Sequence, residues 1–326
     1  MPKDALAFWL SEPGVGQNRL VPVPDPGPGD VLVRTQHSAI SRGTESLVFR
    51  GAVPTSQYAT MRAPFQDGDF PGPVKYGYLN VGVVEHGPPQ LVGRSAFCLY
   101  PHQTQYVVTA SAVTVVPDDV PPDRAVLAGT VETAVNALWD AGPLVGDRVT
   151  VIGAGMVGCC VARLLALIPG VHVTLVDVDP ARAAVADALG ADFALPADAS
   201  DGRDLVVHTS ATSAGLQLAL GLLVTDGTVI DLSWYGDQDI HLSLGTDFHS
   251  RRLSIRASQV GTISPARQGR RSMSERLALA MALLADPAFD HVITGHSPFA
   301  DLPETMRRIA LGETSTICHV IDYGEG

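Results

Sequence analysis

The chain has 326 residues, of which 46% are hydrophobic and 17% charged, and its formal net charge is −12. This length predicts two domains, and the acidic balance excludes a nucleic-acid partner because phosphates would be repelled by such a surface. No apolar run reaches the roughly 20 residues that span a bilayer, and residues 1–14 lack the pattern of a signal peptide. We therefore expect a cytoplasmic protein that uses no membrane partner.

Residues 1–120 carry the pattern of a β-rich domain. Short runs of alternating apolar residues, such as 30–41 and 80–87, are separated by clusters of proline and glycine. This pattern predicts a compact, barrel-like substrate domain.

The pattern changes in residues 121–265, where helical segments alternate with continuous apolar runs. The apolar runs, which are typical of parallel strands covered on both faces, are residues 149–155, 172–179, 204–210, 227–236 and 253–261. This alternation predicts an α/β fold with a doubly wound parallel sheet, a Rossmann domain. Residues 266–326 are then expected to form a separate C-terminal segment of helix, strand, helix and strand.

A glycine-rich turn closes the first of these runs and opens a helix, as in dinucleotide-binding proteins. Gly153 permits the tight turn, Gly155 lets the backbone approach a pyrophosphate, and Gly158 lets the helix pack close to the strand. The N-terminus of the helix then faces the phosphates. The residues that we assign to this site are Gly153, Ala154, Gly155, Met156, Val157 and Gly158. The alternative is a glycine-rich turn in an α/β protein that binds no cofactor.

The second apolar run ends at Asp177, which follows Gly158 at the distance expected of the acidic residue in this motif. A carboxylate there can accept hydrogen bonds from both ribose hydroxyls of NAD and would repel the additional phosphate of NADP. NAD is therefore the expected cofactor, while Arg182, a little further on, leaves NADP open as the alternative.

Further cofactor contacts are expected at the carboxyl ends of the strands, where nucleotides bind in open sheets. The residues at these positions are Ser210, Ala211, Ser233, Trp234 and Gln259. Arg42, oriented by Glu45, is a candidate for contact with the pyrophosphate, and Thr133 completes the expected cofactor set.

A β-rich domain, a Rossmann unit and a returning C-terminal segment together resemble the medium-chain dehydrogenase/reductase superfamily over nearly the whole chain. The resemblance implies a GroES-like β-barrel as the first domain and a C-terminal segment that folds back onto it. It also implies an active site in the cleft between the domains.

The motifs that hold catalytic zinc in this superfamily are altered here. The early loop, residues 41–46, contains no cysteine, Tyr78 stands where the family has a histidine, and the third ligand position falls near Gly129. A catalytic zinc needs three protein donors, so we expect no metal. The cysteines form no CxxC pair and are interpreted as core residues; they are Cys98, Cys159, Cys160 and Cys318.

The loop sequence SRGTES also resembles that of a zinc-free subgroup containing hydroxyethyl-bacteriochlorophyllide dehydrogenase and many uncharacterised relatives. The segments PVKYGY and TVETAVNALWDAG are similar to sequences of the same subgroup. The resemblance implies oxidation of a secondary alcohol with NAD. It covers too few residues to imply the chlorophyll substrate.

Without zinc, a side chain must handle the hydroxyl proton of the substrate. Tyr78 is the first candidate, and its ordinary pKa of about 10 would have to be lowered by a nearby cation. Lys75 is one of two lysines in the chain and is close enough in sequence to pair with Tyr78 as a general acid and base. The alternative is that Tyr78 is a packing aromatic residue and Lys75 is solvated.

Two further residues complete the expected catalytic set. Thr44 lies where the superfamily often keeps a proton-relaying hydroxyl, with a structural hydroxyl as the alternative. Glu132 opens a predicted helix, where it would either stabilise the helix dipole or face the nicotinamide. The histidines His37, His102 and His249 are scattered, and we expect no catalytic role for them.

These observations predict a zinc-independent, NAD(H)-dependent oxidoreductase that interconverts a secondary alcohol and a ketone on a small or medium organic substrate. The alternatives are an NAD(P)H-dependent enone or quinone reductase and a dinucleotide-binding redox sensor without turnover. We also expect a homo-oligomer, a dimer or tetramer, that pairs through residues 227–261 at the edge of the Rossmann sheet.

Overall fold

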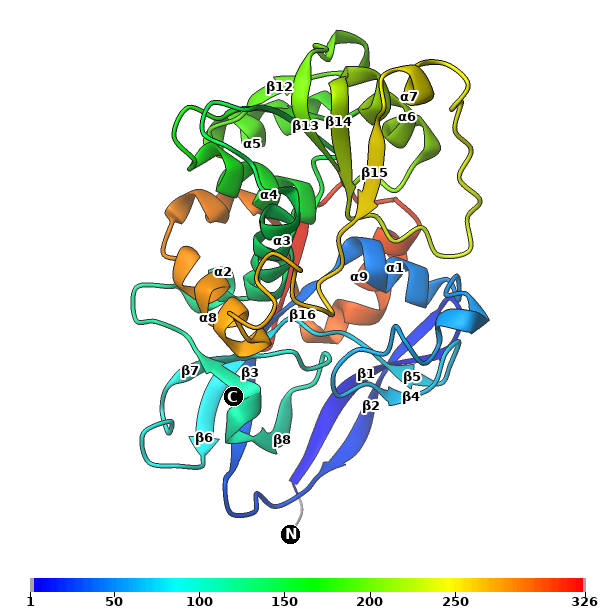
Figure 1. Ribbon diagram of the computed structural model, residues 1–326. Coiled ribbons are helices and arrows are strands. Elements are labelled where there is room, and N and C mark those ends of the chain that lie inside the picture. The colour runs from blue at the N-terminus through cyan, green and yellow to red at the C-terminus, as the bar shows by residue number, and fades with distance from the viewer. Residues whose placement is uncertain (1–2, 325–326) are drawn as a thin grey trace. The chain divides into compact units, whose positions relative to one another are not determined.

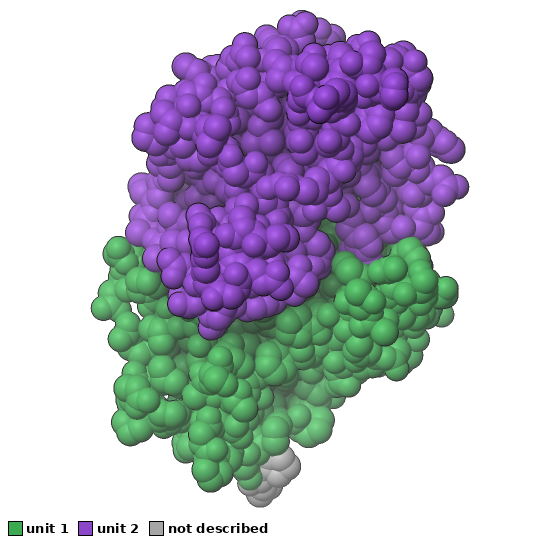
Figure 2. All heavy atoms as spheres, in the orientation of Figure 1, with its two compact units in different colours: residues 1–129, 293–326 green, residues 130–292 purple. Residues whose placement is uncertain are grey.

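The computed structural model describes residues 3–324 and divides the chain into two compact units. Unit 1 combines the residues up to 129 with those from 293 onward, and unit 2 comprises residues 130–292 (Figure 2). The predicted boundaries at residues 121 and 266 therefore lie too early. Residues 266–292 stay with unit 2 because Arg276 of helix α8 (Met273–Leu283) is buried against helix α3 (Ala128–Ala141), where it binds Glu132.

Unit 1 contains two sheets, one with the strand order β2-β1-β5-β4 and one with the order β16-β17-β3-β6-β7-β9, in which β8 also pairs with β3 (Figure 1). The expected barrel is thus present as two sheets that do not close on themselves in the described part of the chain. Strand β17 pairs with β3 in antiparallel orientation, which brings the C-terminal segment back to the N-terminal strands. The strands are β1 (Lys3–Glu12), β2 (Val15–Val23), β3 (Asp30–Ile40), β4 (Asp67–Gly68), β5 (Val74–Lys75), β6 (Asn80–His86), β7 (Ser95–Cys98), β8 (Gln105–Thr109), β9 (Val113–Val115), β16 (Ile293–Pro298) and β17 (Cys318–Asp322).

The α-helices of unit 1 are short and lie beside these sheets. They are α1 (Arg42–Phe49), α2 (Pro122–Ala125) and α9 (Leu302–Ala310). Helix α1 begins directly after Ser41, whose N–H donates to Glu45 Oε1 at 2.7 Å, and the second half of the helix, residues 45–49, is buried. Its first turn therefore holds the predicted site residues of the early loop in place.

Unit 2 is built on one six-stranded sheet with the order β12-β11-β10-β13-β14-β15. Every neighbouring pair in this sheet is parallel, which confirms the predicted doubly wound parallel sheet. The sequence pattern did not reveal β12, because this edge strand has only three residues. The strands are β10 (Arg148–Ile152), β11 (His172–Val176), β12 (Asp192–Ala194), β13 (Arg203–His208), β14 (Leu223–Asp231) and β15 (Ser254–Ala257).

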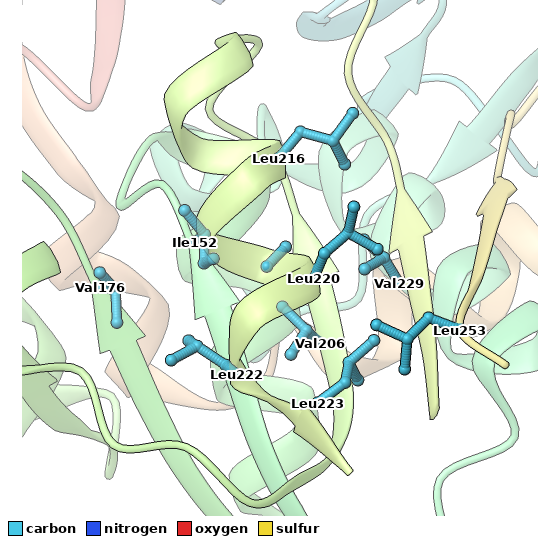
Figure 3. Packing of buried hydrophobic residues seen from close by; sticks show 10 residues of the cluster. Ile152, Val176, Val206, Leu216, Leu220, Leu222, Leu223, Val229 and Leu253 are labelled. Carbon is cyan, nitrogen blue, oxygen red and sulfur yellow. The ribbon is translucent and has the colours of Figure 1, made fainter. Parts of the chain in front are cut away.

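Helices α4 (Met156–Ala166), α5 (Ala183–Ala188) and α6 (Ser213–Leu222) lie against this sheet and help to bury its apolar strands. The other helices of unit 2 are α3, α8 and the short α7 (Asp247–Ser250). Side chains of the strands, among them Ile152 and Val206, pack against Leu216 and Leu220 of α6 (Figure 3). Each such buried side chain stabilises the fold by about 1.5–3 kcal/mol. None of the helices within residues 3–324 is long and apolar enough to cross a membrane.

Candidate active site

The glycine turn joins β10 to α4, and each of its three glycines meets a different constraint. Gly153 has a φ of +104°, which favours glycine, and a Cβ there would lie 2.9 Å from the backbone nitrogen of Ser210. A Cβ on Gly158 would lie only 1.8 Å from the carbonyl oxygen of Gly153. A Cβ on Gly155 would meet no atom within 4 Å. The turn is therefore closed at two glycines and open at the third.

The open glycine lies at the N-terminus of α4. Gly155 is the N-cap residue of this helix, and no side chain caps it. The N–H groups of the first turn, at Met156, Val157 and Gly158, have no carbonyl partner within the helix. They carry the positive end of the helix dipole, so this turn offers space, donors and positive potential to an anionic group.

Asp177 follows β11 and directs its carboxylate at the same turn. Oδ2 accepts a hydrogen bond from Ala154 N at 2.7 Å, and Oδ1 accepts one from Asp179 N at 2.9 Å. The guanidinium of Arg182 pairs with Asp179, with 3.4 Å between Nε and Oδ2. A carboxylate without a bound arginine thus stands beside the glycine turn.

The other predicted cofactor residues are only partly brought together. Ala211 N donates to Ser233 Oγ at 3.2 Å, and Ala211 itself has a φ of +52°. Trp234 is half-buried near this point, and Thr133 lies on α3. The Gln259 side chain turns back on its own loop, where Oε1 accepts from Gly261 N at 2.7 Å, so it does not point toward the strand ends.

A buried histidine, which the sequence analysis missed, joins the strand ends of unit 2. His208 ends β13 directly opposite Asp231, which ends β14. His208 Nδ1 lies 3.0 Å from Asp231 Oδ1, and Nε2 lies 2.8 Å from Ser210 Oγ. Burial by itself would raise the pKa of Asp231, but hydrogen bonds from His208, Tyr235 and the Ser233 N–H hold this pKa below its ordinary value. The sequence contained a signal for this pair, because each of two consecutive apolar runs has a polar residue, His208 or Asp231, near its end.

In unit 1, Tyr78 lies among hydroxyl groups of the early loop. Its hydroxyl donates to Ser41 Oγ at 2.7 Å and also interacts with the Thr44 hydroxyl. Burial and the negative charge of Glu45 raise the pKa of Tyr78 to about 12, although both hydroxyl contacts act in the opposite direction. Tyr78 is therefore protonated at neutral pH.

The predicted pairing of Tyr78 with Lys75 is wrong. Lys75 Nζ donates to Gln103 Oε1 at 2.9 Å, lies 3.9 Å from Asp67 Oδ2 and sits 5.5 Å from the ring centre of Tyr100. Burial lowers the pKa of Lys75, and Asp67 partly offsets this effect. Proximity in sequence failed as a guide because the Lys75 side chain leaves β5 toward Gln103 and Tyr100.

Glu45 also has different partners from those expected. Instead of orienting Arg42, its Oε2 lies 2.9 Å from His102 Nε2, and both residues are buried. The exposed Arg42 donates through Nη1 to the Thr316 carbonyl oxygen at 3.4 Å. His102 Nδ1 in turn lies 2.7 Å from Ser38 Oγ. The histidine that was expected to be incidental therefore forms part of a buried polar network.

Glu132 belongs to a structural ion pair. It lies on the second turn of α3, so it does not open the helix as predicted, and its Oε1 accepts from Arg276 Nε at 3.0 Å. Arg276 is fully buried and also donates to Asn136 Oδ1 and to the carbonyl oxygens of Val260 and Thr262. Burial raises the pKa of Glu132, and Arg276 opposes this shift. The expected catalytic role for Glu132 is thus corrected to an anchor for the loop that leads to α8.

The residues at the positions where the resemblance places zinc ligands do not fit a zinc ion. Tyr78 is a protonated phenol bound to Ser41, and Gly129 has no side chain, whereas catalytic zinc requires three donors such as cysteine, histidine or carboxylate. Within residues 3–324, no three His, Cys, Asp or Glu side chains are grouped so that they could hold a metal. The cysteines are buried free thiols.

Comparison of the chain with known proteins found no matching family model. An L-threonine 3-dehydrogenase of Mesorhizobium japonicum is 28% identical over 229 residues, which cover 62% of this chain and 64% of the relative, slightly less than two thirds of its length. A D-guloside 3-dehydrogenase of Shigella flexneri is 26% identical over 323 residues, covering 85% of this chain and 87% of the relative.

Solved structures match over the full length. A zinc-binding-type dehydrogenase of Sinorhizobium meliloti bound to NADP has a TM-score of 0.79 at 17% identity, covering 98% of this chain and 100% of the other. A structure described as a short chain alcohol dehydrogenase of Escherichia coli in complex with NADH has a TM-score of 0.77 at 16% identity, covering 98% of this chain and 99% of the other. The solved structures confirm the predicted α/β fold. The names of the two sequence relatives, both dehydrogenases, agree with the predicted enzyme class, an oxidoreductase.

Proposed function

We propose that this protein is a zinc-independent, NAD(H)-dependent oxidoreductase that interconverts a secondary alcohol and a ketone on a small or medium organic substrate. The observation that carries the proposal is the open space at Gly155, at the uncapped N-terminus of α4 and beside the carboxylate of Asp177. The relatives named threonine and guloside dehydrogenases support a small-molecule substrate. Because the sequence of residues 41–46 resembles the zinc-free subgroup, we expect the functional relatives of this protein in that subgroup.

The residues around the glycine turn fit a nicotinamide dinucleotide. The N–H groups of Met156 and Val157 would bind its pyrophosphate, and Asp177 would exchange its contact with Ala154 N for the adenosine ribose. NAD is favoured over NADP because the Asp177 carboxylate would repel an additional phosphate, and Arg182 pairs with Asp179. The nicotinamide, when bound, accepts or donates the hydride.

Tyr78 supports the reductive direction, from ketone to alcohol. A phenol with a pKa of about 12 is a poor base at neutral pH but can protonate an alkoxide. In our proposal Tyr78 gives its proton to the carbonyl oxygen while the carbonyl carbon receives hydride, and Ser41 and Thr44 orient the phenol. An enone reductase is the second candidate, because the same protonated phenol can hydrogen-bond the carbonyl oxygen of an enone.

The decisive experiment fills the open space at Gly155. Gly155→Val should fold, since its Cβ meets no atom within 4 Å, yet it should lose NADH affinity because the side chain would occupy the pyrophosphate site. Gly245→Val is the matched control, since its Cβ also meets no atom within 4 Å and it lies elsewhere in unit 2. Titration with NADH and NADPH should show at least about tenfold tighter binding of NADH, the effect of roughly one strong repulsive contact.

Turnover separates the candidate activities. The wild-type protein should be assayed with NADH against ketones, enones and quinones, and with NAD against secondary alcohols. Reduction of ketones supports the proposal, and activity confined to enones or quinones supports the second candidate. NADH binding without turnover of any compound would favour a redox sensor, and a wild-type protein that binds neither nucleotide would refute all three.

We also propose that the protein pairs with a second copy through the β15 edge of its sheet. All four residues of β15 are exposed, and within residues 3–324 only β14 pairs with this strand. An exposed edge offers unpaired N–H and C=O groups for a further strand. Ile255→Pro should shift the protein from dimer to monomer in light scattering, because proline removes an edge donor; an unchanged mass would exclude this interface.

A further inference from the structure

Five polar side chains form a continuous hydrogen-bonded array at the carboxyl ends of β13 and β14. His208 lies between Asp231 and Ser210, at 3.0 Å and 2.8 Å. Tyr235 donates to the other carboxylate oxygen of Asp231 at 2.7 Å, and Thr212 Oγ1 lies 3.1 Å from Ser210 Oγ. His208 is fully buried, while Ser210 is half-buried and Thr212 exposed, so the array runs from the interior to the surface.

The partners fix the direction of each hydrogen bond. Asp231 accepts from Tyr235 and from Ser233 N, so as a carboxylate it also accepts from His208 Nδ1. Our inference takes His208 with its proton on Nδ1 and a lone pair on Nε2, so that the Ser210 hydroxyl donates to Nε2.

At the outer end of the array, the hydrogen bond between Thr212 and Ser210 is also donated toward the interior. Thr212 Oγ1 accepts from Gly215 N at 3.0 Å as the N-cap of α6, so its own hydroxyl proton is free to be donated to Ser210. Ser210 Oγ then uses its proton on His208 and one lone pair on Thr212. What this oxygen offers to a ligand is its second lone pair, an acceptor.

The array lies in the line that a bound dinucleotide would follow. In the sheet order, β11 with Asp177 is followed by β10 with the glycine turn and then by β13 with Ser210. The backbone nitrogen of Ser210 lies 2.9 Å from where a Cβ of Gly153 would stand. With the adenosine at Asp177 and the pyrophosphate on the turn, the next group of the dinucleotide beyond the turn is its second ribose.

We infer that Ser210 accepts a hydrogen bond from a hydroxyl of the nicotinamide ribose, and that His208 and Asp231 are positioning residues that hold Ser210 as an acceptor. This inference rests on the proposed function, because it concerns the same cofactor. It adds side chains that recognise the nicotinamide half, whereas the glycine turn and Asp177 serve the pyrophosphate and the adenosine.

The same three residue types would also suit a nucleophilic serine, in which histidine and a carboxylate activate the hydroxyl. The surroundings of Ser210 argue against that role. Ala211 N, the neighbouring donor that would stabilise an oxyanion, is bound to Ser233 Oγ. The array is therefore suited to binding rather than to acyl transfer.

Three ligands of increasing length test the inference. ADP lacks the second ribose, ADP-ribose contains it, and NADH adds the nicotinamide. Ser210→Ala should weaken ADP-ribose and NADH by about tenfold, as expected for one hydrogen bond, and should leave the Kd of ADP unchanged. Isothermal titration calorimetry on the full chain gives all three values. Ser38→Ala is the matched control, because Ser38 has the corresponding contact with His102 in unit 1, and it should change none of them.

Two amide variants separate positioning from mere packing at His208. The amide of His208→Gln reaches the Nε2 position and can still accept from Ser210, whereas the shorter His208→Asn keeps a donor for Asp231 but leaves Ser210 without an acceptor. His208→Asn should therefore weaken ADP-ribose about as much as Ser210→Ala does, and His208→Gln should restore most of the affinity. In the Ser210→Ala background the two amides should bind ADP-ribose equally.

The outcomes distinguish this inference from the proposed function. A wild-type protein that binds none of the three ligands refutes the proposed function itself. If the wild type binds them, the inference is overturned when Ser210→Ala weakens ADP as much as ADP-ribose, or when only NADH is affected. It is also overturned when His208→Asn and His208→Gln bind ADP-ribose equally in the presence of Ser210.

Discussion

Each unit of this protein holds one buried histidine between a carboxylate and a serine, and the two arrangements differ in where they end. In unit 1, His102 lies between Glu45 and Ser38, and Ser38 Oγ continues to the Tyr323 hydroxyl at 2.9 Å. In unit 2, His208 lies between Asp231 and Ser210, whose hydroxyl is half-buried.

The difference lies in the last hydroxyl of each network. Ser38 is 0% exposed and both of its hydrogen bonds are used within unit 1, so that network is complete without a ligand. Ser210 has an acceptor site left over at the edge of the sheet where a dinucleotide would bind. The combination of carboxylate, histidine and serine therefore does not by itself define a functional site, and the access of a ligand to the terminal oxygen does.

The largest expected effect is a loss of stability at alkaline pH, because unit 1 buries two thiols that are neutral in the folded protein. Burial raises the pKa of the Cys98 and Cys318 thiols from 9.0 to about 12. Between these values the unfolded chain loses protons that the folded chain retains, so stability is fully present below pH 9 and falls as pH rises toward 12. Each of the two thiols should reduce the free energy of unfolding by about 2 kcal/mol at about pH 10.5, and the two together by about 4 kcal/mol.

Urea unfolding at a series of pH values measures this loss. Burial also raises the pKa of Cys159 in unit 2 to about 12, so Cys318→Ala removes one of three such thiols and should make the decline with pH about one third less steep. A midpoint that is constant from about pH 8 to about pH 10.5 would show that these thiols are not buried as described. The tyrosinate absorbance of Tyr78 and Tyr106 should appear only together with unfolding, since burial raises both of their pKa values.

The second prediction concerns the half-buried Tyr78 of unit 1, whose hydroxyl lies among those of Ser41 and Thr44. Tyr78→Phe removes the proposed proton donor and should reduce kcat by about a hundredfold with little change in KM, the usual size of a general-acid contribution. Lys75→Met should stay within about threefold of the wild type, because Lys75 contacts Gln103 and Asp67 rather than Tyr78. Equal losses in both variants would restore the Tyr78–Lys75 pair that the structure contradicts.

A third prediction compares the two carboxylates directly. Glu45→Gln should destabilise the protein by about 2 kcal/mol, because it leaves His102 with a poor partner in a buried site. Asp231→Asn should cost about 1 kcal/mol or less, since the amide oxygen can still accept from Ser233 N–H, the amide NH2 can donate to the Tyr235 oxygen, and the site lies nearer the surface. Thermal unfolding of both variants decides the order, and a larger loss for Asp231→Asn would reverse the comparison.

The smallest expected effects come from the tyrosines that each bind one member of the two histidine networks, Tyr323 in unit 1 and Tyr235 in unit 2. Tyr323→Phe and Tyr235→Phe each remove one hydroxyl, from Ser38 and Asp231 respectively. Each should cost about 1 kcal/mol, the ordinary value of a hydrogen bond. Only Tyr235→Phe should also alter NADH affinity, by a few fold, since it loosens the array behind Ser210. A change in affinity for Tyr323→Phe would mean that the unit 1 network is not closed.

The sequence was a good guide to the fold because its apolar runs are long and regular. All five runs predicted as parallel strands are strands of the unit 2 sheet, and only the three-residue β12 was missed. The glycine turn was equally readable, since Gly153 and Gly158 meet close backbone atoms that no other residue would tolerate. Such local constraints leave a direct mark on the sequence.

Contacts between distant residues left no such mark. Glu132 and Arg276 are 144 positions apart, so nothing near Glu132 signalled a buried partner. Lys75 and Tyr78 were adjacent enough to suggest a pair, but the direction of a side chain depends on which neighbours surround its strand. His208 and Asp231 were within reach of prediction, because consecutive parallel strands often lie side by side and both residues close an apolar run.

The buried Arg276 has a practical consequence for handling the protein. It ties the carbonyl groups of Val260 and Thr262 to α3, while the stretch after them exposes Arg267, Arg270 and Arg271. Trypsin should therefore nick the chain there before it cuts elsewhere in unit 2. The two fragments should remain associated through the hydrogen bonds of Arg276. The nicked protein should therefore migrate as one species in a native gel and as two fragments in a denaturing gel.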